Sequence, residues 1–265
     1  MPSATRPGFV RLWLGAHLRL VYLFLYLPIV VLMVLSFNRA GLPTVWSGFS
    51  VKWYGALLDS KPILNAALNT LIVALCSTAL ATLLGALLAV GMEYRRRGPA
   101  LEAVLFAPMI IPDIVLAIAL LSFFTLLDFT LGLHSIILSH VVFNIAFVCA
   151  VVRTRLRQFD WSVFEASVDL GASEATTFRR IILPLILPGV LAGAMLSFTL
   201  SVDEFIIAYF TAGAGQSSTT LPMQIYSMIR FGVTPEINAM ATVVMLVSFT
   251  LVLAAQRVNR GSITG

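Results

Sequence analysis

Six long apolar segments restrict the folds open to this chain more than any other feature. Each segment is close to the roughly 20 residues that a helix needs to cross the hydrocarbon core of a bilayer. The runs are too uniformly apolar for the alternating strands of a membrane barrel, whereas helices satisfy their own backbone hydrogen bonds in lipid. Hydrophobic residues make up 59% of the sequence and charged residues only 11%, unlike a soluble domain. We therefore predict an all-α membrane protein with six transmembrane helices, at residues 20–37, 67–92, 103–127, 131–152, 189–211 and 239–255.

The distribution of basic residues predicts the orientation of these helices. An even number of spans places both termini on one side, and that side receives thirteen of the 17 Lys and Arg residues. Such an excess is typical of the cytoplasmic side. We expect cytoplasmic ends at 1–19 and 257–265, a six-helix membrane domain at 20–256, and a cytoplasmic loop at 153–188. The net charge of +5 then reflects topology and contact with the anionic lipid bilayer, and does not indicate nucleic-acid binding.

The loop between the fourth and fifth spans is polar and amphipathic. Ser162 and Glu165 fit a capping box, which predicts a helix that begins at Ser162. Ser173 is placed to cap a second short helix, so the Gly-Ala-Ser stretch that ends there predicts a turn between two helices lying along the membrane. Pro184 and Pro188 are expected to end this insert before the fifth span. A polar insert in such an apolar chain indicates a surface that another protein binds.

The spacing within this insert resembles the cytoplasmic coupling loop of ABC importer permeases. The pattern is Glu165-Ala-Ser, then Gly171 six residues after the Glu, then Ile181-x-Leu183-Pro184. The resemblance implies a type I ABC importer permease fold with six transmembrane helices and cytoplasmic coupling helices. For Glu165 alone, the alternative is an interfacial helix in which the side chain serves only its own cap. The residues that the resemblance assigns to ATPase coupling are Glu165, Ala166, Ser167, Gly171, Ala172, Phe178, Ile181, Leu183 and Pro184.

Further segments resemble the membrane subunits of polyamine importers, in particular the second permease subunit of the spermidine/putrescine family. They include Trp46-Ser-Gly-Phe49, Ile111-Pro112-Asp113, Ser201-Val-Asp203 and Leu221-Pro-Met-Gln. The resemblance implies a bacterial inner-membrane subunit without a cofactor, which moves solute by alternating access. It also implies a heterodimer with a second permease, a cytoplasmic ABC ATPase dimer and a periplasmic substrate-binding protein. Permeases for opines and phosphonates share much of this framework and remain the alternative.

Three carboxylates lie within or at the ends of predicted spans, where each costs about 2.5 to 3.5 kcal/mol at a helix centre. No Lys or Arg lies deep in a predicted span to pair with them, so a cationic substrate or a watery path is the remaining compensation. Pro108 and Pro112 interrupt the third span, and broken helices are tolerated where they line cavities. Aromatic neighbours can add cation–π contacts. Structural hydrogen bonding and ordinary packing are the alternatives. The predicted substrate-path residues are Asp113, Asp203, Glu204, Phe205 and Tyr209.

No motif for catalysis or metal binding accompanies these features. The sequence has no Walker A, dinucleotide-binding or metalloprotease motif, so ATP hydrolysis is expected in a separate partner. Cys76 and Cys149 are isolated within spans and are interpreted as small hydrophobic residues. His140 and Asn144 lie one helical turn apart, which predicts hydrogen bonds between helices. A secondary transporter and an intramembrane enzyme are the rival classes, and we see neither the inverted repeat nor the nucleophile that they require.

Overall fold

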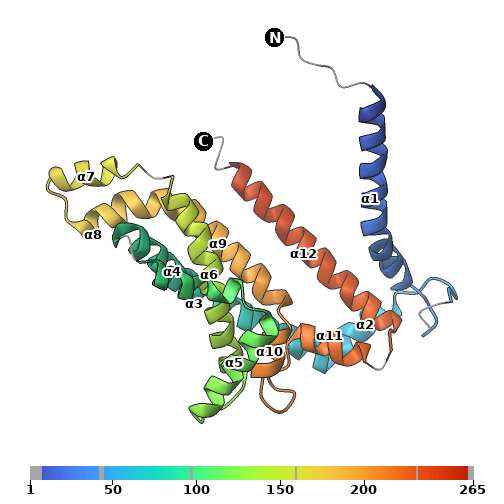
Figure 1. Ribbon diagram of the computed structural model, residues 1–265. Helices are drawn as coiled ribbons and strands as arrows, with labels where there is room; N and C mark the ends of the chain where they lie inside the picture. The colour runs from blue at the N-terminus through green and yellow to red at the C-terminus, as the bar shows by residue number, and fades with distance from the viewer. Residues whose placement is uncertain (1–7, 42–44, 96–97, 159, 231, 262–265) are drawn as a thin grey trace. The chain divides into compact units, whose positions relative to one another are not determined.

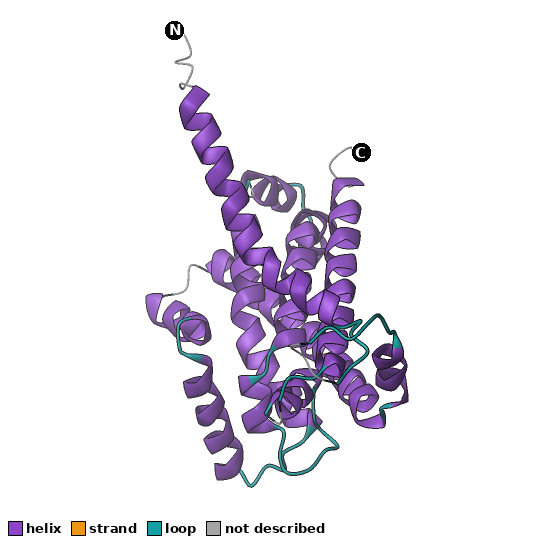
Figure 2. Cartoon of the chain, turned by 90° about the vertical axis from the view of Figure 1, so that its right-hand side faces the viewer, coloured by secondary structure: helices purple, strands orange, loops and turns teal. Residues whose placement is uncertain are grey.

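Helices make up most of the chain, as the ribbon in Figure 1 and the cartoon in Figure 2 show. The computed structural model describes residues 8–41, 45–95, 98–158, 160–230 and 232–261. Within these ranges the one β pairing is an isolated bridge between Asn38 and Phe49. The elements, in chain order, are α1 (Gly8–Leu35), α2 (Lys52–Asp59), α3 (Lys61–Arg95), α4 (Pro99–Phe106), the 3₁₀ turn η1 (Ala107–Met109), α5 (Asp113–Leu126), α6 (Leu133–Leu156), α7 (Ser162–Asp169), α8 (Glu174–Thr177), the π-helical segment η2 (Phe178–Ile182), α9 (Leu183–Asp203), α10 (Ile206–Thr211), α11 (Leu221–Ile229) and α12 (Pro235–Gly261).

The chain divides into two compact units. The larger is Pro62–Gln224, and the smaller joins Met1–Lys61 to Ile225–Gly265. In the smaller unit α12 contacts both α1 and α2. The chain leaves α1 in a turn at Ser36, whose hydroxyl lies 2.7 Å from the Tyr54 hydroxyl of α2. This bond folds the loop after α1 back onto α2.

The core of the larger unit is a seam of three helices in which α3 and α9 both pack on α6. Gly85 of α3 and Gly193 of α9 face the same residue, Val148. A Cβ added at Gly85 would lie 2.8 Å from the Val148 Cβ, and one added at Gly193 would lie 3.3 Å from its Cγ1. Small residues of this kind let helices approach closely, as is common in membranes. Buried apolar side chains continue the seam toward η2: Ala81, Ala89, Met92, Cys149, Val152, Leu156, Ile182 and Ile186.

Several helices in the described ranges are long and apolar enough to cross a membrane, so the prediction of a multi-pass helical protein is confirmed. The number of six spans is not confirmed. Four helices pass by length and composition, and a fifth span results if one bent pair is counted as a unit. The four are Val10–Leu35, Lys61–Tyr94, Leu133–Leu156 and Glu174–Asp203; the bent pair is Pro99–Met109 with Asp113–Leu126, and Pro235–Thr250 is a shorter apolar helix.

Two of the predicted spans are not continuous helices. The span predicted at 103–127 bends by 105° just before Asp113, as the prolines indicated. Pro112 lacks a backbone donor and disfavours helical geometry in the residue before it. The continuous span predicted at 189–211 is wrong, because α9 ends at Asp203 and Glu204 is extended, with ψ of 120°. The broken span and the end of α9 supply the polar groups of the second candidate site.

The prediction that Pro184 and Pro188 end the polar insert as helix-stopping residues is wrong, because neither proline interrupts the helix. Both prolines lie within α9, and the helix runs without interruption from Glu174 to Asp203. The π-helical segment η2 ends at Ile182, two residues before Pro184, and its backbone hydrogen bonds span five residues instead of four. Such an adjustment accommodates a residue that cannot donate a backbone hydrogen bond. The second part of the insert, formed by α8 and η2, is therefore a direct extension of α9.

Candidate functional site

The polar insert, defined here as residues 160–184, begins with a helix capped by an acidic side chain. Helix α7 begins at Ser162 as predicted, but the predicted capping box with Glu165 does not form. Instead, Oδ1 of Asp160 accepts the backbone N–H of Ser162 at 3.0 Å. This hydrogen bond lowers the pKa of the Asp160 carboxyl below its ordinary value. Glu165 remains exposed in the first turn, where a carboxylate suits the helix dipole.

A Schellman turn ends α7 at the predicted position. The backbone N–H of Gly171 donates to the Val168 carbonyl at 2.8 Å, and that of Ala172 donates to the Ser167 carbonyl at 3.1 Å. Gly171 has φ of +84°, in the left-handed region. No other atom lies within 4 Å of the position that its Cβ would take. Glycine is therefore favoured by backbone conformation, and a side chain would project into open space.

The second short helix is joined to the first by side chains as well as by the turn. Ser173 caps α8 as predicted, its Oγ accepting the backbone N–H of Thr176 at 3.3 Å. The hydroxyls of Ser167 and Thr177, both buried, lie 2.8 Å apart. The two short helices are thus fixed to each other across the turn.

Tyr94 at the end of α3 contacts both short helices. Its ring meets Phe164 of α7 edge-on with centroids 5.5 Å apart, and its hydroxyl donates to Oε1 of Glu174 at 3.2 Å. Trp161 and Phe178 pack on the apolar cluster of the seam. The insert is therefore held against the end of the three-helix seam, so a force on the insert reaches α3 and α9 directly.

The predicted coupling residues differ in exposure. Ser167 is buried, whereas Ala172, Phe178 and Ile181 are partly buried. Leu170, which the sequence analysis did not single out, exposes 88% of its surface at the tip of the insert. An apolar residue directly before the turn glycine of a polar loop is the sequence feature that could have identified Leu170. The exposed predicted residues are Glu165, Ala166, Gly171, Leu183 and Pro184.

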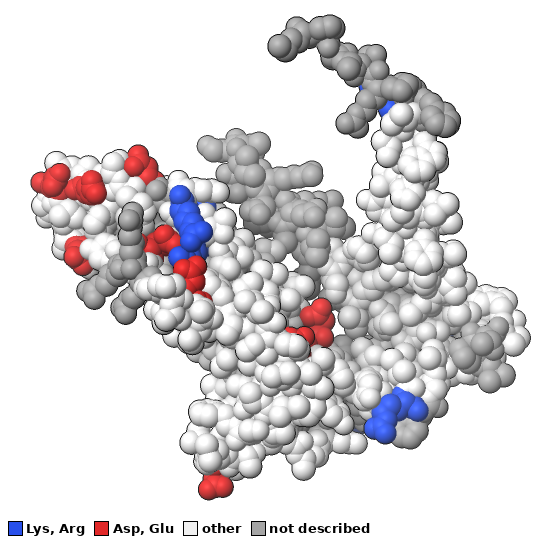
Figure 3. Space-filling view, in the orientation of Figure 1, with Lys and Arg blue, Asp and Glu red and all other residues white. Residues whose placement is uncertain are grey.

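Charged side chains are paired at the base of the insert. Arg153 of α6 contacts Glu93 of α3 and donates to the two carboxylate oxygens of Glu102 at 2.7 and 3.3 Å. Arg157 lies 3.4 Å from the Glu93 carboxylate. On the face drawn in Figure 3, acidic and basic side chains gather near this end, and the flanks of the larger unit are mostly uncharged. The charges thus avoid the apolar helix surfaces.

The second candidate site is the break between α9 and α10. The Glu204 carboxylate accepts the backbone N–H groups of Ile207 and Ala208, both at 3.0 Å, and so caps α10. Its side chain is only 8% exposed. Asp203, by contrast, is exposed. The predicted acidic pair is therefore divided into one carboxylate that is turned inward and one that remains accessible.

The break also gathers other predicted path residues. Asp113 opens α5, which packs on α10, and its carboxylate is close enough to repel that of Glu204. Phe205 and Tyr209 lie together at the start of α10, with ring centroids 5.4 Å apart. The structure thus places Asp113, Glu204, Phe205 and Tyr209 around one helix break. Asp203, the fifth predicted residue, directly precedes Glu204 in the chain.

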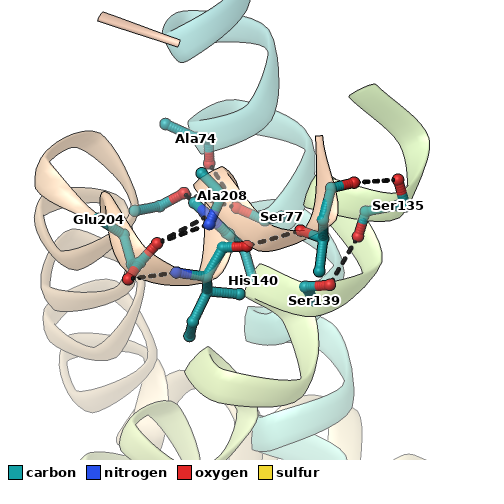
Figure 4. A network of polar contacts seen from close by, with 10 residues as sticks. Ala74, Ser77, Ser135, Ser139, His140, Glu204 and Ala208 are labelled. Atoms are coloured by element: carbon teal, nitrogen blue, oxygen red, sulfur yellow. Dashed lines mark hydrogen bonds and ion pairs between the residues drawn. The ribbon is translucent and has the colours of Figure 1, made fainter. Parts of the chain in front are cut away.

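A buried polar network connects the break to the seam, as Figure 4 shows. Nδ1 of His140 lies 2.7 Å from Oγ of Ser201, which lies 3.0 Å from Oγ of Ser77. On the other side of the ring, Nε2 of His140 is 3.6 Å from Oε2 of Glu204. The predicted hydrogen bonding between helices is confirmed for His140 and wrong for Asn144, whose buried amide has no hydrogen-bond partner in the described chain. The sequence analysis assigned no role to Ser77 or Ser201.

Known proteins resemble this chain over nearly its whole length. Residues 81–263 match the family described as "Binding-protein-dependent transport system inner membrane component". The chain is 44% identical over 257 residues to the spermidine/putrescine transport system permease protein PotC of Escherichia coli K12, covering 96% of this chain and 97% of the relative. It is 40% identical over 242 residues to the putrescine transport system permease protein PotI of the same strain, covering 88% and 85%.

Solved structures give the fold. A bacterial ABC transporter that imports the acidic polysaccharide alginate aligns with a TM-score of 0.76 and 14% identity, covering 97% of this chain and 99% of that one. The MetNI methionine ABC transporter aligns with a TM-score of 0.60 and 19% identity, covering 80% and 99%. The fold is that of a type I ABC importer permease.

Proposed function

This chain belongs to the family of binding-protein-dependent transport system inner membrane components, and we propose that it is a permease subunit of an ATP-driven polyamine importer. The observation that carries the substrate class is the 44% identity to a spermidine/putrescine permease across 257 residues. The helical, membrane-spanning fold supports the same function. The chain is a transport subunit and moves solute without chemical change.

The polar insert is proposed as the docking surface for a cytoplasmic ABC ATPase. Two features support this role: the exposed side chains of Leu170 and Glu165, and a firm attachment to the seam through Tyr94. An exposed apolar side chain on a polar loop has a natural place in a hydrophobic pocket of a partner. The partners proposed with it are a second permease that completes the path and a periplasmic substrate-binding protein.

The break between α9 and α10 is proposed as part of the substrate path. The carboxyl groups of Asp113, Asp203 and Glu204 border this break, and an acidic border attracts a polycation more strongly at low effective dielectric than in water. The rings of Phe205 and Tyr209 are placed to contact an ammonium group. Irregular backbone at membrane depth is tolerated where it borders a cavity.

Reconstitution tests the proposed function directly. The chain is assembled in proteoliposomes with its second permease, the ATPase and the binding protein, and ATP-dependent uptake of labelled spermidine, putrescine and an opine is compared. Saturable uptake of a polyamine, competed by unlabelled polyamine and absent without ATP, is the expected result. Uptake of the opine alone would contradict the substrate class and leave the importer class standing, whereas uptake without ATP would contradict both.

Topology is a separate part of the proposal: a multi-pass protein of the bacterial inner membrane with both termini in the cytoplasm. In a chain cleared of Cys76 and Cys149, single cysteines at Ser173 and Gln216, both exposed, report the two sides. An impermeant maleimide should label Gln216→Cys in intact cells and Ser173→Cys only after lysis. External labelling of Ser173→Cys would overturn the orientation.

A further inference from the structure

His140 is a fully enclosed imidazole in the middle of α6, a helix otherwise dominated by apolar side chains. It is 1% exposed. A polar ring in such surroundings is costly unless its two nitrogens have partners. Its ring contacts Ser201 of α9 and Glu204 at the break before α10, and Ser201 in turn contacts Ser77 of α3.

The Ala74 carbonyl, which can only accept, favours one direction for the hydrogen bonds of the hydroxyl chain. Ser77 donates to the carbonyl of Ala74 at 3.3 Å, so its oxygen accepts from Ser201, and the Ser201 oxygen in turn accepts from Nδ1–H of His140. A neutral imidazole with its proton on Nδ1 presents the lone pair of Nε2 to Glu204. The hydroxyls on α3 and α9 thus favour this tautomer and this ring orientation.

The Nε2 lone pair and an ionised carboxylate would repel each other across the 3.6 Å that separates them. One proton held by the pair, on either partner, removes this repulsion and leaves the pair neutral overall. A neutral pair suits the apolar seam better than an isolated carboxylate does.

Glu204 has a second task that depends on its position. Both of its oxygens accept backbone N–H groups at the start of α10, where donors otherwise lack partners. A carboxylate drawn toward a passing polycation would release these donors. A partner behind the carboxylate, on the seam side, keeps it in place.

We propose that His140 is a positioning residue for the substrate path, which holds Glu204 on the start of α10 and shares one proton with it. The fixed negative charge at the break then comes from Asp113 and Asp203, and Glu204 maintains the geometry through which the substrate passes. This inference rests on the proposed transport function. It assigns His140 no contact with the substrate.

A double-mutant cycle on the reconstituted importer tests this inference. His140→Leu introduces an apolar side chain of similar bulk and is expected to lower the maximal uptake rate about tenfold, because Glu204 is left unpaired. In a Glu204→Gln background, where no carboxylate needs a partner, the same change should cost less than about twofold. His140→Gln, whose amide can donate to Glu204, should retain at least about half of the rate.

Ser139→Ala is the matched control. Ser139 is a buried neighbour on α6 whose hydroxyl donates only within its own helix, to the Ser135 carbonyl at 2.8 Å, so uptake should stay near wild type. Equal losses from His140→Leu in both backgrounds would assign His140 to packing and overturn the inference, as would normal uptake by His140→Leu. Wild-type importer that carries no polyamine refutes the proposed function instead, and the cycle can then be run on the solute that it does carry.

Discussion

The two candidate sites satisfy their polar groups in opposite ways. At the base of the polar insert, charges meet charges: Arg153 contacts Glu93 and Glu102. At the helix break, the inward carboxylate of Glu204 meets backbone N–H groups and the imidazole of His140, whose other neighbour is a hydroxyl. Ion pairs are inexpensive where water is near, and dipoles with a shared proton are less costly inside an apolar seam. The contrast is consistent with a chain whose insert lies in water and whose break lies within the membrane.

The sites also differ in how they present themselves to a partner. The insert exposes Leu170 and Glu165, and the turn at Gly171 and the contacts of Tyr94 fix its shape. The break encloses Glu204 and exposes Asp203. Exposed side chains on a base of fixed shape suit a surface that docks a protein. An accessible carboxylate beside an enclosed one suits a path for a small cation.

Arg153→Met is expected to have the largest effect, because it leaves two carboxylates at the base of the insert without their shared cation. Loss of a partly buried ion pair by removal of one partner costs about 2 to 3 kcal/mol, below the fully buried range because Glu102 is half exposed. Thermal unfolding in detergent should show the loss, and assembly with the ATPase should fail. Arg157→Met is the control, since its side chain is 61% exposed and should cost less than about 1 kcal/mol. Equal shifts in both variants would contradict a special role of Arg153.

Gly171→Leu tests whether the insert docks the ATPase. The φ of +84° strains any non-glycine residue by roughly 1 kcal/mol, and the leucine side chain would project where a partner is expected. Insertion of the chain into the membrane should persist, while co-purification of the ATPase and uptake are lost. Gly171→Asn separates strain from bulk, because asparagine tolerates this conformation, and should retain more activity. Normal uptake by Gly171→Leu would remove the role proposed for the insert.

Asp203→Asn with Glu204→Gln tests the substrate path and has an intermediate expected effect. Removing the carboxylate charges should lower uptake and substrate-stimulated ATP hydrolysis, with assembly and substrate binding by the periplasmic partner unchanged. The single variants sharpen the comparison: Asp203→Asn should raise the KM for spermidine by about tenfold, and Glu204→Gln by less than about threefold. A double variant that transports spermidine and putrescine at wild-type rates would show that the pair is structural and would weaken the polyamine assignment.

Asp160→Ala should have the smallest effect, on local order at the start of α7. The Ser162 N–H lowers the pKa of the Asp160 carboxyl, so its stabilising contribution is present above the unfolded-state pKa and is lost as pH falls through the folded-state pKa. Protection factors of the α7 amides, corrected for the intrinsic pH dependence of exchange, should therefore fall in the wild type as the pH drops below the ordinary aspartate pKa of about 3.9, and should already be low at neutral pH in the variant. Exchange that is unchanged at neutral pH would show that the cap is dispensable.

Local chemistry made parts of both sites predictable from the sequence. The start of α7, the cap at Ser173 and the turn at Gly171 follow from hydrogen bonds between residues close in the chain. The break beside Asp113 follows from Pro112. The predicted capping box with Glu165 does not form, also for a local reason, because Asp160 instead of Glu165 accepts the Ser162 N–H.

The sequence by itself determined the class of the protein and the chemistry at its turns, because membrane length, basic-residue distribution and capping are properties of short segments. Only the tertiary structure decided which polar groups meet. Ser77, His140 and Ser201 come from three helices, and their contacts depend on the register of the seam around Gly85 and Gly193. The same packing turned Glu204 inward and left Asp203 exposed. No periodicity in the sequence predicts this difference between adjacent carboxylates, because it arises from partners that are distant in the chain.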